Sequence, residues 1–130
     1  MNRDRTNELS AGVVYRRIPN RRTHFDEDAG RPERGAFEPR PSDNNGLSVD
    51  VDRSAAESKL QQYPGFGLCA LDIAEIKRVT GGSAWVAKPL SGSHTRIENC
   101  DREEVQLALA NIATVVIPPT FQRRRWTGNR

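Results

Sequence analysis

Long apolar segments, cysteine and histidine are all scarce in this chain of 130 residues. No run approaches the roughly 20 apolar residues that cross a bilayer, so we expect no membrane association. The first ten residues are charged and contain no apolar segment of the kind found in secretory leaders. Two cysteines and two histidines neither form a disulfide framework nor match the ligand spacing of a zinc site. These absences predict a cytoplasmic protein that holds no metal and no cofactor.

Motifs that define large enzyme classes are also missing. The chain has no phosphate-binding loop ending in Lys and Ser or Thr, and no Gly-x-Ser-x-Gly nucleophile motif. The glycines of the segment PGFG at 64–67 come before a predicted strand rather than after one, and their spacing differs from the dinucleotide-binding pattern. Motif-defined nucleotide, zinc and serine-hydrolase chemistry is therefore disfavoured.

The net charge of +3 has its basic part at the C-terminus. The last ten residues hold four arginines and no acidic residue, whereas residues 46–120 are slightly acidic. Arginines can hold phosphates, and a neighbouring aromatic side chain can stack on bases. Arg123, Arg124, Arg125 and Trp126 are therefore candidates for a nucleic-acid contact. The acidic balance of the remaining chain argues against a broad basic face, and a solvated tail is the alternative.

Hydrophobic periodicity predicts six strands and three helices in the order β, long loop, β-α-β-α-β-β-α-β. The strands are expected at 12–18, 46–51, 66–71, 84–88, 94–98 and 114–117. The helices are expected to begin at the capping residues Ser54, Asp72 and Asp101 and to extend to about residues 62, 79 and 112. This alternation favours an α/β or α+β fold in which about three helices pack on a small sheet, with parallel and antiparallel strands both open.

Composition divides the chain into four parts. They are a flexible N-terminus at 1–11, an edge strand plus irregular arm at 12–46, a compact α/β core at 47–117 and a basic tail at 118–130. Pro19 ends the first strand, which favours an edge position for it. The arm is rich in proline, glycine and charge and shows no periodicity, but Phe25 and Phe37 can pin it to the core.

Four residues are candidates for a functional site. Arg16, followed by Arg17, lies on the first strand and can hold a phosphate or nucleotide. His24 lies next to three carboxylates, which should favour its charged form, so it can act as a general acid or a pH-sensitive contact. Ser48 lies on the second strand, and His94 follows a Gly-Ser loop at the rim of the sheet. Ordinary solvation or turn capping is the alternative for each of them.

Seven short motifs occur in order along the chain. They are YRRI at 15–18, GRP at 30–32, AF at 36–37, GLSVD at 46–50, GFG at 65–67, PL at 89–90 and His94. This order resembles that of a group of small uncharacterised bacterial proteins, over about residues 13–98. The resemblance transfers no activity, but it implies that the arm is ordered. Arg16, His24 and Arg31 should then be tested together as members of one site.

Three functional hypotheses follow. The first is a small bacterial binding or accessory protein that acts through a protein partner or a homo-oligomer, because the core is small and no catalytic constellation stands out. The second is a minimal nucleotide-directed enzyme, loosely similar to ADP-ribosyltransferase domains, which use an early basic residue, a later strand serine and usually a glutamate. Glu98 is the candidate for that glutamate. The third is nucleic-acid binding through the arginine-rich tail, so enzyme activity stays an open question.

Overall fold

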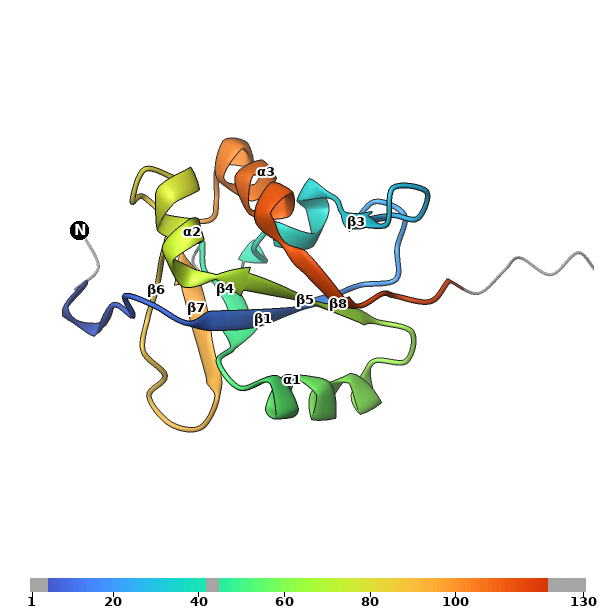
Figure 1. The fold of residues 1–130 in the computed structure, drawn as a ribbon, viewed down its shortest axis with the longest axis horizontal. Coiled ribbons are helices and arrows are strands. Elements are labelled where there is room, and N and C mark those ends of the chain that lie inside the picture. Colours follow the sequence, from blue (N-terminus) through green and yellow to red (C-terminus); the bar gives the residue numbers. More distant parts are fainter. Residues whose placement is uncertain (1–4, 42–44, 122–130) are drawn as a thin grey trace, which may run out of the picture.

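The structure, a computed structural model, describes residues 5–41 and 45–121. Its centre is a six-stranded sheet with the order β6-β7-β4-β1-β5-β8, and neighbouring strands are antiparallel (Figure 1). The strands are β1 (Val13–Ile18), β4 (Leu47–Asp50), β5 (Gly67–Asp72), β6 (Trp85–Val86), β7 (His94–Glu98) and β8 (Thr114–Ile117). The predicted mixture of a small sheet and three helices is confirmed.

Three helices cover the two faces of the sheet. α1 (Arg53–Lys59) lies on one face, and α2 (Ile73–Val79) and α3 (Glu103–Ile112) contact each other on the opposite face (Figure 1). Short 3-10 turns lie at η1 (Arg5–Asn7), η2 (Arg34–Phe37) and η4 (Leu60–Gln62). Among the described residues, no helix combines the length and the apolar character needed to cross a bilayer.

Aspartates begin two of these helices. The carboxylates of Asp52 and Asp72 each accept a hydrogen bond from the main-chain amide three residues on, at 3.0 and 3.1 Å. The cap predicted at Asp72 is confirmed. The cap predicted at Ser54 is wrong, because Asp52 takes that position and the helix already begins at residue 53. The cap predicted at Asp101 is also wrong, since Arg102 precedes α3 and makes no side-chain cap.

β1 lies in the middle of the sheet, between β4 and β5, so the predicted edge position is wrong. Six residue pairs join β1 to β5 along its whole length. Pro19 comes after the last of them and therefore removes no hydrogen bond from the ladder.

The pairing of β1 with β4 is much shorter. Within the described strands, it consists of the single pair Tyr15–Asp50, whereas four pairs join β4 to β7. The sheet therefore has two well-paired halves that meet at a narrow seam. Between the end of β1 at Ile18 and the start of β4 at Leu47, the seam is open.

The arm between β1 and β4 is part of the folded body. It contains the two-stranded sheet of β2 (Phe25–Asp26) and β3 (Arg31–Pro32), and its turn η2 packs against α3. Phe25 and Phe37 are buried in the same core cluster as Val14 and Ile18 of β1, so the predicted anchoring of the arm is confirmed. The hydrophobic core therefore draws on residues well before position 47.

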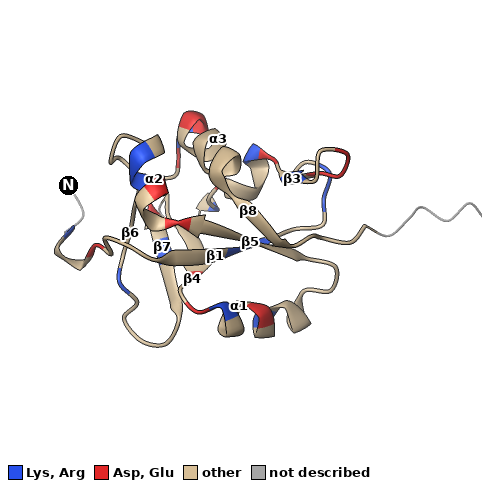
Figure 2. Cartoon of the chain, in the orientation of Figure 1, with Lys and Arg blue, Asp and Glu red and all other residues tan. Residues whose placement is uncertain are grey.

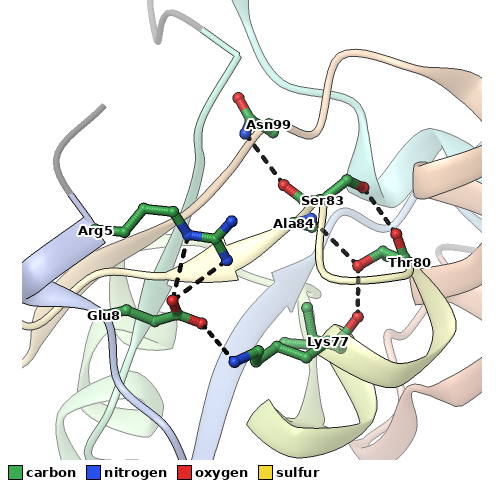
Figure 3. Close-up of polar contacts among 8 residues, drawn as sticks. Arg5, Glu8, Lys77, Thr80, Ser83, Ala84 and Asn99 are labelled. Carbon is green, nitrogen blue, oxygen red and sulfur yellow. Dashed lines mark hydrogen bonds and ion pairs between the residues drawn. The ribbon is translucent and has the colours of Figure 1, made fainter. Parts of the chain in front are cut away.

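The N-terminal segment covers the outer side of β6. The amide of Leu9 donates to the carbonyl of Val86 at 2.8 Å, and the amide of Lys88 donates to the carbonyl of Asn7 at 2.7 Å. Glu8 lies between these contacts and pairs with Lys77 of α2 (Figure 3). At the opposite end of the sheet, no strand of the described residues pairs with the outer side of β8.

Candidate functional site

A hollow of about 500 Å³ opens at the seam between β1 and β4. We call it the seam cleft. Its walls come from the end of β1, the arm, the start of β4 and the segment that follows α1, so residues far apart in the sequence meet there. Its charged and polar lining includes Arg16, Arg17, Arg21, His24, Glu38, Arg40, Ser48 and Tyr63.

Arg16 bridges the open part of the seam. Strand alternation places its side chain on the same face as Val14 and Ile18, both fully buried. Its Nε donates to the carbonyl of Ala36 at 3.1 Å, and its Nη1 donates to the carbonyl of Ser48 at 2.9 Å. The guanidinium thus ties the arm to β4 where main-chain pairing has ended. Burial lowers the pKa of Arg16 to about 10, which still leaves the group charged at neutral pH.

The arginines of the seam cleft differ from most of the other described basic residues in their partners. Eight arginines and lysines elsewhere lie within 3.5 Å of a carboxylate, and such neighbours are visible on α1 and α2 (Figure 2). Among the described residues, no carboxylate pairs with the four arginines of the cleft, which are Arg16, Arg17, Arg21 and Arg40. Glu38, the carboxylate of the described lining, is exposed. The cleft therefore carries positive charge that this part of the protein does not neutralise by ion pairing.

An aromatic surface forms one side of the cleft. The guanidinium carbon of Arg17 lies 4.3 Å from the centre of the Tyr63 ring, a cation–π contact. The rings of Tyr63 and Phe66 lie 5.1 Å apart and are tilted by 38°. Arg17 is therefore held in place by an aromatic ring, which leaves its charge uncompensated.

His24 lies in the seam cleft, with its Nδ1 3.0 Å from the hydroxyl of Thr23. The sequence predicted that neighbouring carboxylates would favour the charged ring, and the structure corrects this. Burial, together with the charges of Arg21 and Arg16, lowers the pKa of His24, and Glu38 opposes this only in part. The neutral ring is therefore favoured at pH 7.

Three of the four candidate residues meet in this cleft. Arg16, His24 and Ser48 all line it, whereas His94 does not. His94 lines a neighbouring hollow of about 320 Å³, which we call the polar hollow, and Ser48 belongs to its wall as well. His94 also lines a further hollow beside Trp85.

Glu98, the proposed acid of the enzyme hypothesis, lies in that further hollow rather than with Arg16. Its carboxylate is buried and pairs with Arg96 at 3.4 Å. The similarity to ADP-ribosyltransferase domains requires one site that contains Arg16, Ser48 and Glu98. The structure does not bring these three residues together.

Sequence reasoning missed Arg21, Arg40 and Tyr63 as members of the site. Arg21 and Arg40 lie in loop segments of the arm, and Tyr63 follows η4, so no periodic pattern marks them. Close packing brings the arm across the cleft: a Cβ at Gly35 would lie 2.6 Å from the carbonyl oxygen of Thr23, so only glycine fits there. A sequence signal did exist for Arg16, because it lies on the same face of the strand as the apolar residues Val14 and Ile18, which face the core.

The candidate nucleic-acid residues of the tail, Arg123, Arg124, Arg125 and Trp126, lie outside the described residues.

Within the described part of the chain, no group of three or more His, Cys, Asp or Glu side chains is placed to hold a metal ion. Comparisons with protein-family models, with curated proteins and with solved structures give no match.

Proposed function

We propose that this chain is a small binding protein that takes an anionic, phosphate-bearing ligand in the seam cleft. The observation that carries the proposal is a set of four arginines around one hollow that have no carboxylate partner among residues 5–41 and 45–121, where most of the other basic residues are paired. Uncompensated cations that line a concave surface are suited to bind an anion.

Arg16 adds specificity for oxygen acceptors. A guanidinium has five N–H donors, and the carbonyls of Ala36 and Ser48 use two of them. The same two bonds fix the plane of the group, so little side-chain freedom is lost when a ligand binds. A fixed guanidinium fork matches the spacing of phosphate oxygens and forms short, charge-assisted hydrogen bonds with them.

We propose binding rather than a reaction, because Glu98 lies in a different hollow from Arg16. Action through a protein partner or a homo-oligomer stays a prediction from the small size of the core. Co-purification from a native lysate, followed by size-exclusion chromatography, would test it.

Calorimetric titration with pyrophosphate at constant ionic strength tests the proposal. Arg40 is exposed, lines the cleft and makes no hydrogen bond or ion pair with the described residues, so Arg40→Gln should leave the fold intact. We expect this variant to bind pyrophosphate about tenfold more weakly, the change that corresponds to one charge-assisted contact.

The matched control is Arg78→Gln on α2, which removes the same charge from an exposed ion pair with Glu75, away from the cleft. It should bind pyrophosphate like the unmodified chain. Absence of pyrophosphate binding, or an equal loss in both variants, would overturn the proposed function.

A further inference from the structure

The polar hollow lies directly beside the seam cleft. Arg17, Ser48 and Tyr63 line both of them, and the cation–π pair of Arg17 and Tyr63 lies at their common wall. Because three side chains are shared, a single ligand can contact both spaces at once. Together their volumes, about 320 and 500 Å³, lie in the range of small-molecule and cofactor sites.

The chemistry of the polar hollow differs from that of the cleft. Its one described carboxylate, Asp50, is held by Lys59 at 2.7 Å, which balances the charge of both groups. Tyr15, Gln62 and His94 add a phenol, an amide and an imidazole. These groups offer both donors and acceptors with little net charge, so they suit a neutral polar group rich in O–H and N–H.

The common wall adds a flat surface. The guanidinium carbon of Arg17 lies 4.3 Å from the centre of the Tyr63 ring, so the cation and the ring lie side by side in a cation–π contact. Guanidinium planes and aromatic rings are the two surfaces on which nucleobases stack in proteins that bind them.

We propose that the ligand of the seam cleft is a nucleotide whose nucleoside part lies in the polar hollow. The inference rests on the proposed function, because it places the phosphates among the arginines of the cleft. It adds that the sugar hydroxyls and the edge of the base meet the neutral donors and acceptors beside His94, while the base stacks at the wall formed by Arg17 and Tyr63.

The two histidines of the chain allow each space to be observed separately, since His24 lines the cleft and His94 lines the polar hollow. Ring signals of both can be followed by NMR during titration with pyrophosphate, ADP and UDP, after assignment with His94→Gln. Pyrophosphate should move the His24 signals and leave those of His94 in place. A nucleoside diphosphate should move both sets and bind at least tenfold more tightly than pyrophosphate.

Two variants test the stacking wall. Tyr63→Leu should weaken nucleotides more than pyrophosphate, because Tyr63 also supports Arg17 of the seam cleft. Gln62→Ala, an exposed position that lines the polar hollow and not the cleft, should weaken nucleotides and leave the affinity for pyrophosphate within about twofold. Phe121→Leu changes an aromatic residue outside both spaces and should alter neither affinity. Nucleotides that bind no more tightly than pyrophosphate and leave His94 unmoved would overturn the inference, while the proposed function would stand. Failure of pyrophosphate and nucleotides alike would overturn both.

Discussion

The Nη1 atom of Arg16 donates a hydrogen bond of 2.9 Å to the carbonyl of Ser48, across the opening between β1 and β4. The bond replaces main-chain pairing at the place where the two halves of the sheet separate. The side chain that closes the seam therefore also supplies positive charge to the cleft. The carbonyls of Ala36 and Ser48 use two of its N–H donors, so the others are available for the proposed ligand.

The first prediction concerns the shape of this group. Arg16→Lys keeps the charge but cannot reach the carbonyls of both Ala36 and Ser48, so the free energy of unfolding should fall by about 1–3 kcal/mol. Arg17→Lys on the same strand loses only the contact with Tyr63 and should cost about 1 kcal/mol or less. Urea unfolding of the three proteins measures both values, and equal losses would show that Arg16 does not hold the seam.

The second prediction is a pH dependence caused by His24. Its pKa in the folded protein lies below the ordinary value of 6.5 because of burial and of the charges of Arg21 and Arg16. The unfolded chain therefore takes up the proton first as pH falls, so stability should decrease below about pH 6.5 and level off below the folded pKa. His24→Gln should lose less stability than the unmodified chain over that window, as measured by urea midpoints at pH 7.5 and at mildly acid pH.

Ligand binding gives a second measurement on the same ring. Pyrophosphate in the seam cleft would add negative charge near His24, so the NMR-detected pKa of His24 should rise when pyrophosphate is bound. An unchanged pKa in the saturated protein would place the anion elsewhere.

The third prediction concerns the two thiols. Cys69 and Cys100 are buried, and burial raises the pKa of each to about 12. Because the thiolate is the reactive form, the folded protein should react very slowly with a thiol reagent at pH 8, and both residues should react in concentrated urea. Cys69→Ala and Cys100→Ala should each leave one reactive thiol after unfolding. Rapid labelling of the folded chain would show that the core opens locally at these residues.

The fourth prediction concerns the ion pair of Lys59 and Asp50. The Asp50 side chain is 5% exposed, so Lys59→Met would leave a buried carboxylate without its cation. Since Lys59 itself is partly exposed, we expect a moderate loss of about 1–2 kcal/mol in the free energy of unfolding. Arg53→Met on the same helix breaks an exposed pair with Glu57 and should cost about 0.5 kcal/mol or less. Similar losses for both variants would contradict the role assigned to burial.

Local patterns in the sequence predicted most strands and helices. The alternation at 47–50 and the capping aspartate at 72 depend on nearby residues, and both were confirmed. The place of β1 depends on pairing with strands more than 30 residues away, and proline chemistry alone assigned it wrongly to an edge. The candidate site could be predicted only in part, because local patterns mark some of its residues and not others. Arg16 stands out as a charge on a strand. Arg40 and Tyr63 reach the site only because the arm and the end of η4 fold against β1.

The charge state of His24 illustrates a related limit. Its sequence neighbours are acidic, but after folding Arg22 pairs with Glu27, and the side chain of Asp26 accepts a hydrogen bond from the amide of Ala29. Burial of the ring and the positive charges of Arg21 and Arg16 then lower its pKa. The acidic neighbours alone therefore gave the wrong direction for the pKa of His24, because burial and the arginine charges outweigh them.

The cover over β6 has a consequence for how copies of this chain can associate. Asn7 and Leu9 already take up main-chain groups next to β6, so a strand of another molecule cannot be added there. In the six-stranded sheet of the described residues, the outer side of β8 is left for such addition. Two copies that join antiparallel through β8 use the same edge of both sheets, and the contact is closed by its twofold symmetry. Edge-to-edge growth of the sheet would stop at two copies, because the N-terminal segment covers the β6 edge of each copy and leaves no free edge for a third.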